Sequence, residues 1–425
     1  MLRCRQTTLP NGIIVVTDTA GQFQSAALSV SFRAGSVHEP EHLAGITHFL
    51  EHMVFRDTQP GGLMQSFTRF GGYLNALTTH DSTEFQAVVV GEDLHQAISL
   101  IAEHVINPRF DAAAVDLERD VITQEAATTH VLRDAFYAEA FPGQALGRPV
   151  IGYCDTVSGL SHSDLLAHHA RSYVARNLVI AVAGKVNHEA LVAHVAELFE
   201  NMPEGLPTRA PQSHLHAGQV LMPSRPDHAR VRLGYKLPMG DNRSMDALTF
   251  FNAMLGAQGE TALMRSLRSE RGLVYDAWSD MVVHAGTGIF FIEVAGAASD
   301  MADILCVTSD CMQEVARYSQ EHAINLEKCR FQQDERIMLD SLSARVGRLG
   351  AQINQFGTLI DEADRIRSYL NMESHQIARA ASDMLDKEPA IVASGPPARM
   401  PQFSEMRTAL SHGSSRKAPL LRHMN

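Results

Sequence analysis

The sequence has few cysteines, a shortage of basic residues and no long apolar run. Its five cysteines include no close Cys-x-x-Cys pair, so no zinc ribbon is encoded, and we interpret them as free thiols in a reducing compartment. The 36 basic residues are fewer than the 48 acidic ones, which gives a formal net charge of -12. Because nucleic-acid-binding surfaces are basic, this balance argues against nucleic acid as a partner.

No apolar stretch reaches the ~18 residues that a transmembrane helix requires, so no membrane partner is expected. The N-terminus also lacks the pattern of a secretory signal, which is a basic head followed by an apolar segment. Instead, a turn at Pro10-Asn11-Gly12 leads directly into a predicted strand. These absences predict a cytoplasmic protein.

The length of the chain predicts more than one domain. A single hydrophobic core rarely serves 425 residues, and 45% apolar residues are enough to fill two cores. The stretch 201–218 contains three prolines and two glycines, which is typical of a linker. We therefore predict one domain at 1–200 and a second at 219–395. Residues 396–425 are rich in Pro, Ser, Arg and His and are predicted to form a flexible tail.

Strand and helix patterns alternate in both halves, which indicates an α+β fold. In the first half, strands are predicted at 13–17, 26–33, 84–90 and 178–183, and helices at 43–55, 94–105, 113–127, 161–173 and 188–199. In the second half, strands are predicted at 229–235, 274–283 and 288–294, and helices at 245–255, 261–271 and 299–319. The order restarts after the linker, which favours an internal duplication, although two unrelated α+β domains would give a similar pattern.

The segment around residue 50 carries the strongest chemical motif. His48 and His52 are four apart on a predicted helix, so their imidazoles leave the same face about one turn apart. That spacing allows two ring nitrogens to bind one zinc ion. Glu51 lies on the same side and can take a proton from a water molecule at the metal, as a general base does in hydrolysis. A chance match on a helix of this histidine-rich chain is the alternative.

Two histidines need a third protein ligand to make a catalytic zinc site with one open position. Glu118 and Glu125 are seven apart on the predicted helix 113–127, so they share one face. One of them can bind the metal while the other supports a histidine. The alternative is an ordinary solvated face of charged residues.

Together with these motifs, several segments resemble the pitrilysin-type (inverzincin) zinc metallopeptidases, the family that includes mitochondrial processing peptidase. The resembling segments are LPNGIIVV, FRAGSVHEPEHLAGITHFLEHMVF, GGYLNALTTHDSTEF, LGRPVIGYCDTV and RNLVIAVAGKV. The chain is most similar to the two-domain bacterial type, which resembles the beta subunit of that enzyme. The resemblance implies two homologous α+β domains, each a mainly antiparallel sheet with helices packed on one face, forming half of a clamshell.

The resemblance also assigns the metal site. It implies a Zn²⁺ cofactor held by His48, His52 and Glu125, because the second glutamate of the family's Glu-x6-Glu pair is the third ligand. Glu118, the first glutamate of that pair, supports the site. Glu51 acts as the general base.

Two further pairs of residues are assigned to the substrate by the resemblance. Asn75 and Ala76 are placed on a strand whose backbone pairs with an extended peptide. Arg268 and Tyr275 are assigned to the substrate carbonyls from the opposite wall, where a tyrosine hydroxyl can stabilise an oxyanion. The bland alternatives are an ordinary hairpin, an exposed arginine and a packed strand tyrosine.

The predicted function is a zinc-dependent endopeptidase that cleaves short or unfolded peptides bound as an added edge strand. Two alternatives stay open: a dedicated protease that trims a modified peptide precursor with a partner subunit, and a non-catalytic scaffold subunit. Larger relatives enclose the substrate with four such domains, and this chain has two. A homodimer, or a heterodimer with a related subunit, is therefore expected.

Overall fold

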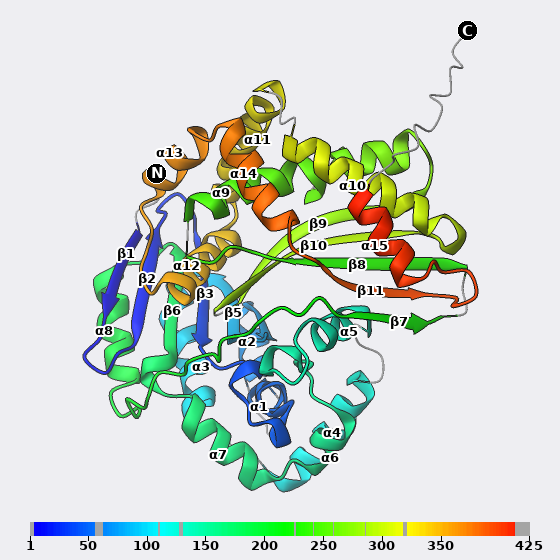
Figure 1. The fold of residues 1–425 in the computed structure, drawn as a ribbon. Coiled ribbons are helices and arrows are strands. Elements are labelled where there is room, and N and C mark those ends of the chain that lie inside the picture. Colours follow the sequence, from blue (N-terminus) through cyan, green and yellow to red (C-terminus); the bar gives the residue numbers. More distant parts are fainter. Residues whose placement is uncertain are drawn as a thin grey trace. The chain divides into compact units, whose positions relative to one another are not determined.

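The computed structural model describes residues 4–55, 63–108, 111–126, 131–224, 227–240, 242–257, 259–284, 286–317 and 321–412. The chain divides into two compact units, each built around its own sheet (Figure 1). Unit 1 contains residues 1–129, 144–212 and 333–365. Unit 2 contains residues 130–143, 213–332 and 366–425.

The sheet of unit 1 has six strands in the order β1-β2-β6-β3-β5-β4. The strands are β1 (Cys4–Thr8), β2 (Ile14–Thr19), β3 (Ser25–Phe32), β4 (Tyr73–Thr78), β5 (Thr83–Val90) and β6 (Leu178–Gly184). β2 and β6 are parallel and all other neighbours are antiparallel. The central strand β6 is buried along its whole length, as its sequence LVIAVAG predicts. β4 ends the order and is therefore an edge strand.

One face of this sheet is covered by seven helices of the first half. They are α1 (Ile46–Phe55), α2 (Leu63–Phe70), α3 (Leu94–Ile106), α4 (Ala112–Ala126), α6 (Cys154–Gly159), α7 (His162–Ser172) and α8 (His188–Leu198). Their apolar stripes share one core with the sheet, in which Phe49 and Leu50 of α1 lie with Phe32 and Phe85 of the strands. This core fixes α1, the helix that carries the His-x-x-Glu-His motif.

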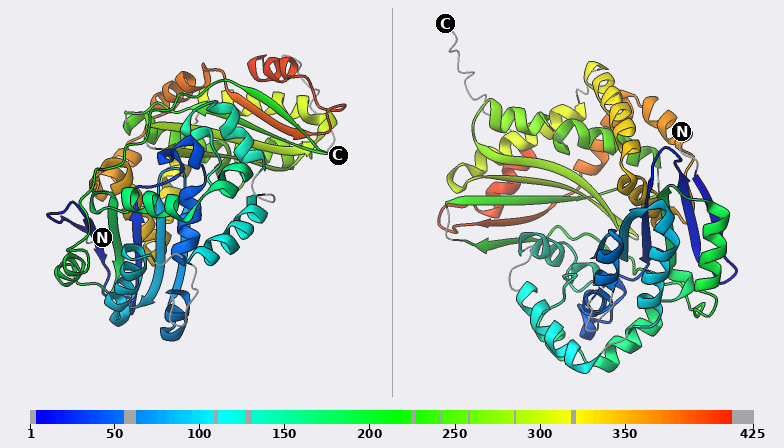
Figure 2. Two further views of the ribbon diagram at one scale, coloured as in Figure 1. Left: turned by 90° about the horizontal axis from the view of Figure 1, so that it is seen from below. Right: turned by 180° about the vertical axis from the view of Figure 1, so that it is seen from behind.

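The other face of the sheet is covered by α12 (Leu342–Phe356), which comes from the second half of the sequence (Figure 2). Leu342, Val346, Leu349 and Ile353 form its apolar stripe and pack on Val16, Ala27, Val179, Ala181 and Ala183. The prediction of helices on one face is therefore incomplete. Because β-sheet side chains alternate between faces, both faces of these strands needed cover.

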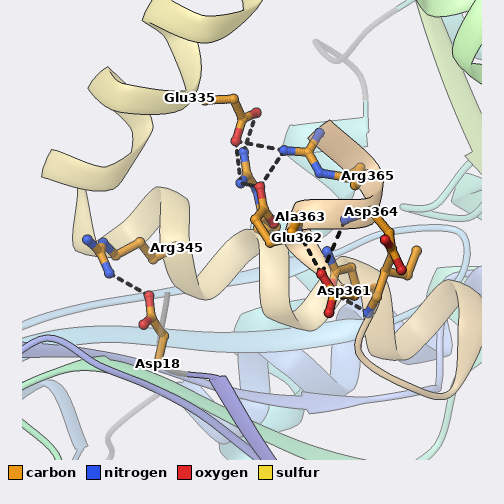
Figure 3. A network of polar contacts seen from close by, with 11 residues as sticks. Asp18, Glu335, Arg345, Asp361, Glu362, Ala363, Asp364 and Arg365 are labelled. Carbon is orange, nitrogen blue, oxygen red and sulfur yellow. Dashed lines mark hydrogen bonds and ion pairs between the residues drawn. The ribbon is translucent and has the colours of Figure 1, made fainter. Parts of the chain in front are cut away.

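Ion pairs hold this segment in place (Figure 3). Arg345 lies on α12, and its Nη1 donates to Oδ2 of Asp18 on β2 at 2.6 Å, with both side chains buried. A second group joins Glu335 and Glu362 to Arg348 of α12 and to Arg365 of the next helix (Figure 3). The first pair is the more costly to break, because it is the more deeply buried.

The Asp18→Asn variant is expected to lower the stability of unit 1 by about 3–5 kcal/mol, since it leaves the Arg345 guanidinium buried without a counter-ion. The measurement is the shift in the thermal or urea midpoint. Glu204→Gln is the matched control, because the ion pair of Glu204 with Arg176 is exposed on both sides and its loss should change little. Equal shifts for the two variants would contradict the expectation.

The sheet of unit 2 has five strands in the order β7-β11-β8-β10-β9. The strands are β7 (Gln219–Pro223), β8 (His228–Lys236), β9 (Val274–His284), β10 (Thr287–Ala297) and β11 (Ala390–Gly395). The remaining helices are α5 (Val131–Ala140), α9 (Asn242–Asn252), α10 (Met301–Arg317), α11 (Glu321–Asp340), α13 (Glu362–Leu370), α14 (Ser374–Leu385) and α15 (Phe403–His412). A π-helical turn at Ala253–Ala257 lies at the end of the predicted helix 245–255. A second one, Met264–Ser269, lies within the predicted helix 261–271. Residues 318 and 319, the last two of the predicted helix 299–319, lie outside the described residues.

The internal duplication is visible in the topology. The parallel pair β7 and β11 corresponds to β2 and β6, and the antiparallel run β11-β8-β10-β9 corresponds to β6-β3-β5-β4. The α+β class with two mainly antiparallel sheets is therefore confirmed. In unit 2 the helix from the other half is α5, whose Phe136 ring packs edge-on against Phe291 of β10.

The compact units follow different limits from the predicted domains 1–200 and 219–395, because α5 belongs to unit 2 and α12 to unit 1. The predicted linker 201–218 contains no helix or strand, and Thr208 N–H donates to Oδ1 of Asn177 at 2.8 Å.

The predicted tail begins too early. Residues 403–412 form α15, which lies along α10 (Figure 1) and places Met406 and Ala409 in the core of unit 2. By its place in the repeat, α15 is the counterpart of α8, which follows β6 as α15 follows β11. Residues 413–425 lie outside the described residues. None of the described helices has the length and hydropathy to span a membrane.

Candidate metal centre

Helix α1 presents its two histidines because its apolar residues fix the opposite side. Ile46, Phe49, Leu50, Met53 and Val54 of the segment ITHFLEHMVF are buried in the core of unit 1. Residues at positions i and i+4 of a helix leave the same face. The rings of His48 and His52 accordingly lie side by side, with centroids 4.5 Å apart.

The structure brings these histidines together with Glu125 of α4. One ligand atom from each of His48, His52 and Glu125 lies within 4.8 Å of the other two, and among the described residues this is the one such group. Nε2 of His52 is 3.6 Å from Oε2 of Glu125. Two ligand atoms around a tetrahedral zinc ion with bonds of about 2 Å are roughly 3.3 Å apart. The donor set and its spacing therefore fit Zn²⁺.

Glu118 lies seven residues before Glu125 on the same face of α4 and is buried. Its Oε1 is 2.8 Å from Nδ1 of His52. A carboxylate partner on Nδ1 leaves Nε2 of His52 as the nitrogen that faces Glu125, the arrangement found around metal-binding histidines. Burial opposes a positive charge on His52, but the bond to Glu118 and the charges of Glu51 and Glu125 raise its pKa.

His48 is held in the neutral form that a metal ligand needs. Burial, and then the neighbouring charge of His52, lower the pKa of His48 to about 3. Its buried Nδ1 has no hydrogen-bond partner within the described part of the chain. A neutral ring offers one nitrogen lone pair, as metal binding requires. The neutral ring of His48 therefore suits a metal ligand at this position.

Glu51 is buried beside the two histidines, and its position is fixed by β4. Thr78 Oγ1 donates to Glu51 Oε2 at 3.0 Å. Burial raises the pKa of Glu51, while His52 and Thr78 oppose the rise. Thr78 therefore holds the Glu51 carboxylate beside the two histidines.

The sequence-predicted substrate residues lie at two places. Asn75, exposed, and Ala76, half-buried, lie on the edge strand β4 of unit 1. Arg268 is exposed on the π-helical turn Met264–Ser269 of unit 2. Tyr275 is 45% exposed near the start of β9 in unit 2, where Arg230 Cζ lies 5.7 Å from its ring centroid. Their roles stay predictions.

Sequence reasoning missed two residues around this site, Thr78 and Glu39. Thr78 lies 27 residues from Glu51, and only the fold of β4 beside α1 brings the two together. Glu39 is buried at the start of α1, where its carboxylate accepts two backbone N–H groups. A Glu a few residues before a helix that carries a site is a signal that could have been used for the second.

Comparisons with known proteins agree with this arrangement. A family model described as Insulinase (Peptidase family M16) matches residues 14–153, and one described as Peptidase M16 inactive domain matches residues 159–328. A Mycobacterium tuberculosis protein named as an uncharacterized zinc protease is 30% identical, over 98% of this chain and 95% of the relative. A probable mitochondrial-processing peptidase subunit beta of Arabidopsis thaliana is 25% identical, over 95% of this chain and 80% of the relative.

Solved structures show the same fold. A protease from Helicobacter pylori superimposes with a TM-score of 0.85 at 20% identity, over 93% of this chain and 100% of that one. The His-x-x-Glu-His order on α1 is the signature of the inverzincins. The chain belongs to peptidase family M16.

Proposed function

We propose that the protein is a zinc-dependent endopeptidase that acts on short or unfolded peptides. The observation that carries the proposal is the group His48, His52 and Glu125, with Glu118 on the far nitrogen of His52. The name of the second family model, an inactive domain, agrees with the position of this group in the first matched region. A non-catalytic scaffold subunit would not need Glu51 beside a complete ligand set.

Zinc, when bound, polarises a carbonyl group and makes a water molecule acidic near neutral pH. His48, His52 and Glu125 would hold the ion, and Glu118 fixes the ring of His52 through Nδ1. Glu51 takes a proton from the attacking water and then passes a proton to the leaving amine. Thr78 keeps the Glu51 carboxylate oriented through that sequence.

The substrate is proposed to bind as an added strand at the outer edge of β4. β4 ends the strand order of unit 1, and its exposed side chains Tyr73, Asn75 and Leu77 alternate with inward ones. An edge strand binds an extended peptide through backbone hydrogen bonds, which depend little on the sequence of the peptide. Peptides, rather than folded proteins, fit this requirement.

Purified protein should cleave members of a mixed peptide library, lose that activity to a chelator and regain it with zinc. A single N-methyl group on the backbone of a good substrate, near the cut, should raise KM by removing one strand-pairing hydrogen bond worth about 1 kcal/mol. Substituting the side chains of the substrate at the same positions should change KM less. Cleavage unaffected by chelator would contradict the metal mechanism, and equal cutting of folded, disulfide-bonded proteins would contradict the edge-strand mode.

The site is proposed to be completed by a second chain, either a second copy or a related subunit. Two relatives carry the word subunit in their names, and the proposed substrate residues Arg268 and Tyr275 lie in unit 2. A tyrosine hydroxyl that stabilises an oxyanion typically contributes 10²–10³-fold to kcat. The alternative of a dedicated protease for one modified precursor differs from a general peptidase in its substrate and not in this chemistry.

A mixed dimer tests the second chain. Glu51→Gln and Tyr275→Phe chains, each nearly inactive alone, should regain up to about half the wild-type activity per dimer if Tyr275 acts across the interface. One site then has both defects and the other has none. No recovery, with mixed dimers verified by mass, would contradict a shared site between two copies. Weak self-association and low activity of the pure chain would favour a related subunit.

A further inference from the structure

The helix that carries the metal motif has an unusual anchor at its N-terminal end. The first backbone N–H groups of any helix lack partners within the helix. At α1, the carboxylate of Glu39 supplies the acceptors. Its Oε2 accepts from Gly45 N–H and its Oε1 accepts from Thr47 N–H, both at 2.8 Å. The Glu39 side chain is buried, and Thr47 directly precedes His48. One carboxylate thus engages two backbone donors at the end of the helix nearest the first ligand.

A chain of hydrogen bonds supports Glu39 from the side of α7. Arg171 Nη2 donates to His168 Nδ1 at 3.0 Å. Because that nitrogen accepts, the neutral ring carries its hydrogen on Nε2, which then donates to Thr47 Oγ1 at 3.0 Å. The neutral form is favoured, since burial and the charge of Arg171 lower the pKa of His168 to about 3. The hydroxyl proton of Thr47 is left for Glu39.

The backbone around the start of α1 is also closely fitted. Gly45 has a φ of +95°, and a Cβ added there would lie 2.5 Å from the carbonyl oxygen of Ile151. Arg148 Nη2 donates to the carbonyl oxygen of Glu39 at 2.7 Å. The start of α1 is therefore held between Glu39, the residues near 150 and helix α7, and it has little room to shift.

We propose that Glu39, supported by Thr47 and His168, is a positioning residue for the metal centre, because it sets the rotation and axial position of α1. This rests on the proposed function. His48 and His52 belong to α1, whereas Glu125 belongs to α4, so any movement of α1 displaces two ligands relative to the third. Metal sites require their ligands to be held within about 0.5 Å of the productive geometry. Burial raises the pKa of Glu39 to about 7, and the hydrogen bonds from Gly45 and Thr47 oppose the rise. The ionised form suits the positive end of the helix dipole.

The test uses Glu39→Gln, which keeps one acceptor oxygen and the shape of the side chain but presents an NH₂ group to one of the two N–H donors. Zinc affinity is measured by competition with a chromophoric chelator, well below the unfolding temperature. It should fall about 10–100-fold, as is typical when a group supporting a metal ligand is lost. In the peptidase assay at saturating zinc, kcat should fall while KM stays unchanged, since β4 is untouched.

Two controls separate positioning from general destabilisation. Glu41→Gln alters an exposed carboxylate in the same segment and should leave affinity unchanged. Asp18→Asn lowers stability through a distant buried ion pair and should leave the zinc affinity of the folded protein unchanged. The proposal is overturned if Glu39→Gln binds zinc as the wild type does, or if Asp18→Asn loses as much affinity at an equal loss of stability.

If Glu39→Gln does not fold, Thr47→Val takes its place, because it removes the hydroxyl and keeps the backbone N–H bond to Glu39. Its zinc affinity should fall several-fold, because the hydroxyl that joins His168 to Glu39 is lost. An unchanged affinity would overturn the proposal. Zinc affinity does not depend on peptide cleavage. A wild-type protein that binds zinc but cleaves nothing would therefore contradict the proposed function and still allow this proposal to be tested.

Discussion

The Glu51→Gln variant is expected to bind zinc as the wild type does and to lose peptidase activity by about 10³–10⁴-fold, the upper range for a general base. Glutamine has the shape of glutamate, and its amide oxygen can still accept from Thr78 Oγ1, which lies 3.0 Å from the native carboxylate. It has no basic oxygen to take a proton from water. The loss should therefore fall on kcat and leave the metal site intact.

Metal analysis and steady-state kinetics on the same preparation check this result. Glu41→Gln is the matched control, because it removes one exposed carboxylate close to α1 in sequence without touching the metal group. If Glu51→Gln cleaved peptides at the normal rate, Glu51 would not be the general base. If it lost zinc as well as activity, Glu51 would be part of the metal shell instead.

The metal group could be predicted from sequence because its geometry is local. His48 and His52 are related by one helical turn, and Glu118 and Glu125 by two, so each pair keeps its spacing whatever surrounds it. The apolar residues of α1 show which face of that helix is buried, and its two histidines lie on the remaining face. The sequence alone left open which glutamate binds the metal, since two helical turns place both on one face.

The contacts that join distant segments could not be predicted. The stripe Leu342, Val346, Leu349 and Ile353 identifies α12 as amphipathic, but any apolar surface would satisfy it, and nothing local indicates the sheet of unit 1. The same holds for Thr78 and Glu51, which meet through the fold of an edge strand beside a helix. Such pairings depend on tertiary structure and leave no periodic trace in the sequence.

Helix α15 was missed for a different reason. The segment after Pro396 has the polar composition of a tail, and the apolar positions Met406 and Ala409 are few. The duplication itself held the missing signal, because α8 follows β6 in the first half and a helix was due after β11 in the second. Comparison of the two repeats up to their last elements therefore predicts this helix, whereas composition alone does not.

The Glu125→Gln variant is expected to lose zinc. Structural zinc sites are worth about 10–16 kcal/mol, and the loss of one of three protein ligands should remove about 4 kcal/mol, roughly a thousandfold in affinity. An amide oxygen carries no charge and binds zinc poorly. The side chain of Glu125 is 42% exposed and Oε2 faces Nε2 of His52 at 3.6 Å, so the substitution should be tolerated by the fold.

Glu118→Gln is the matched comparison, since it makes the same chemical change seven residues earlier on the same helix. Glu118 contacts Nδ1 of His52, on the far side of the ring from Glu125. Its loss should lower zinc affinity by about 10–100-fold, because the histidine loses its carboxylate partner but remains a ligand. Chelator competition on both variants gives the order, and circular dichroism verifies that both are folded. A larger loss for Glu118→Gln than for Glu125→Gln would reverse the assignment and make Glu118 the metal ligand.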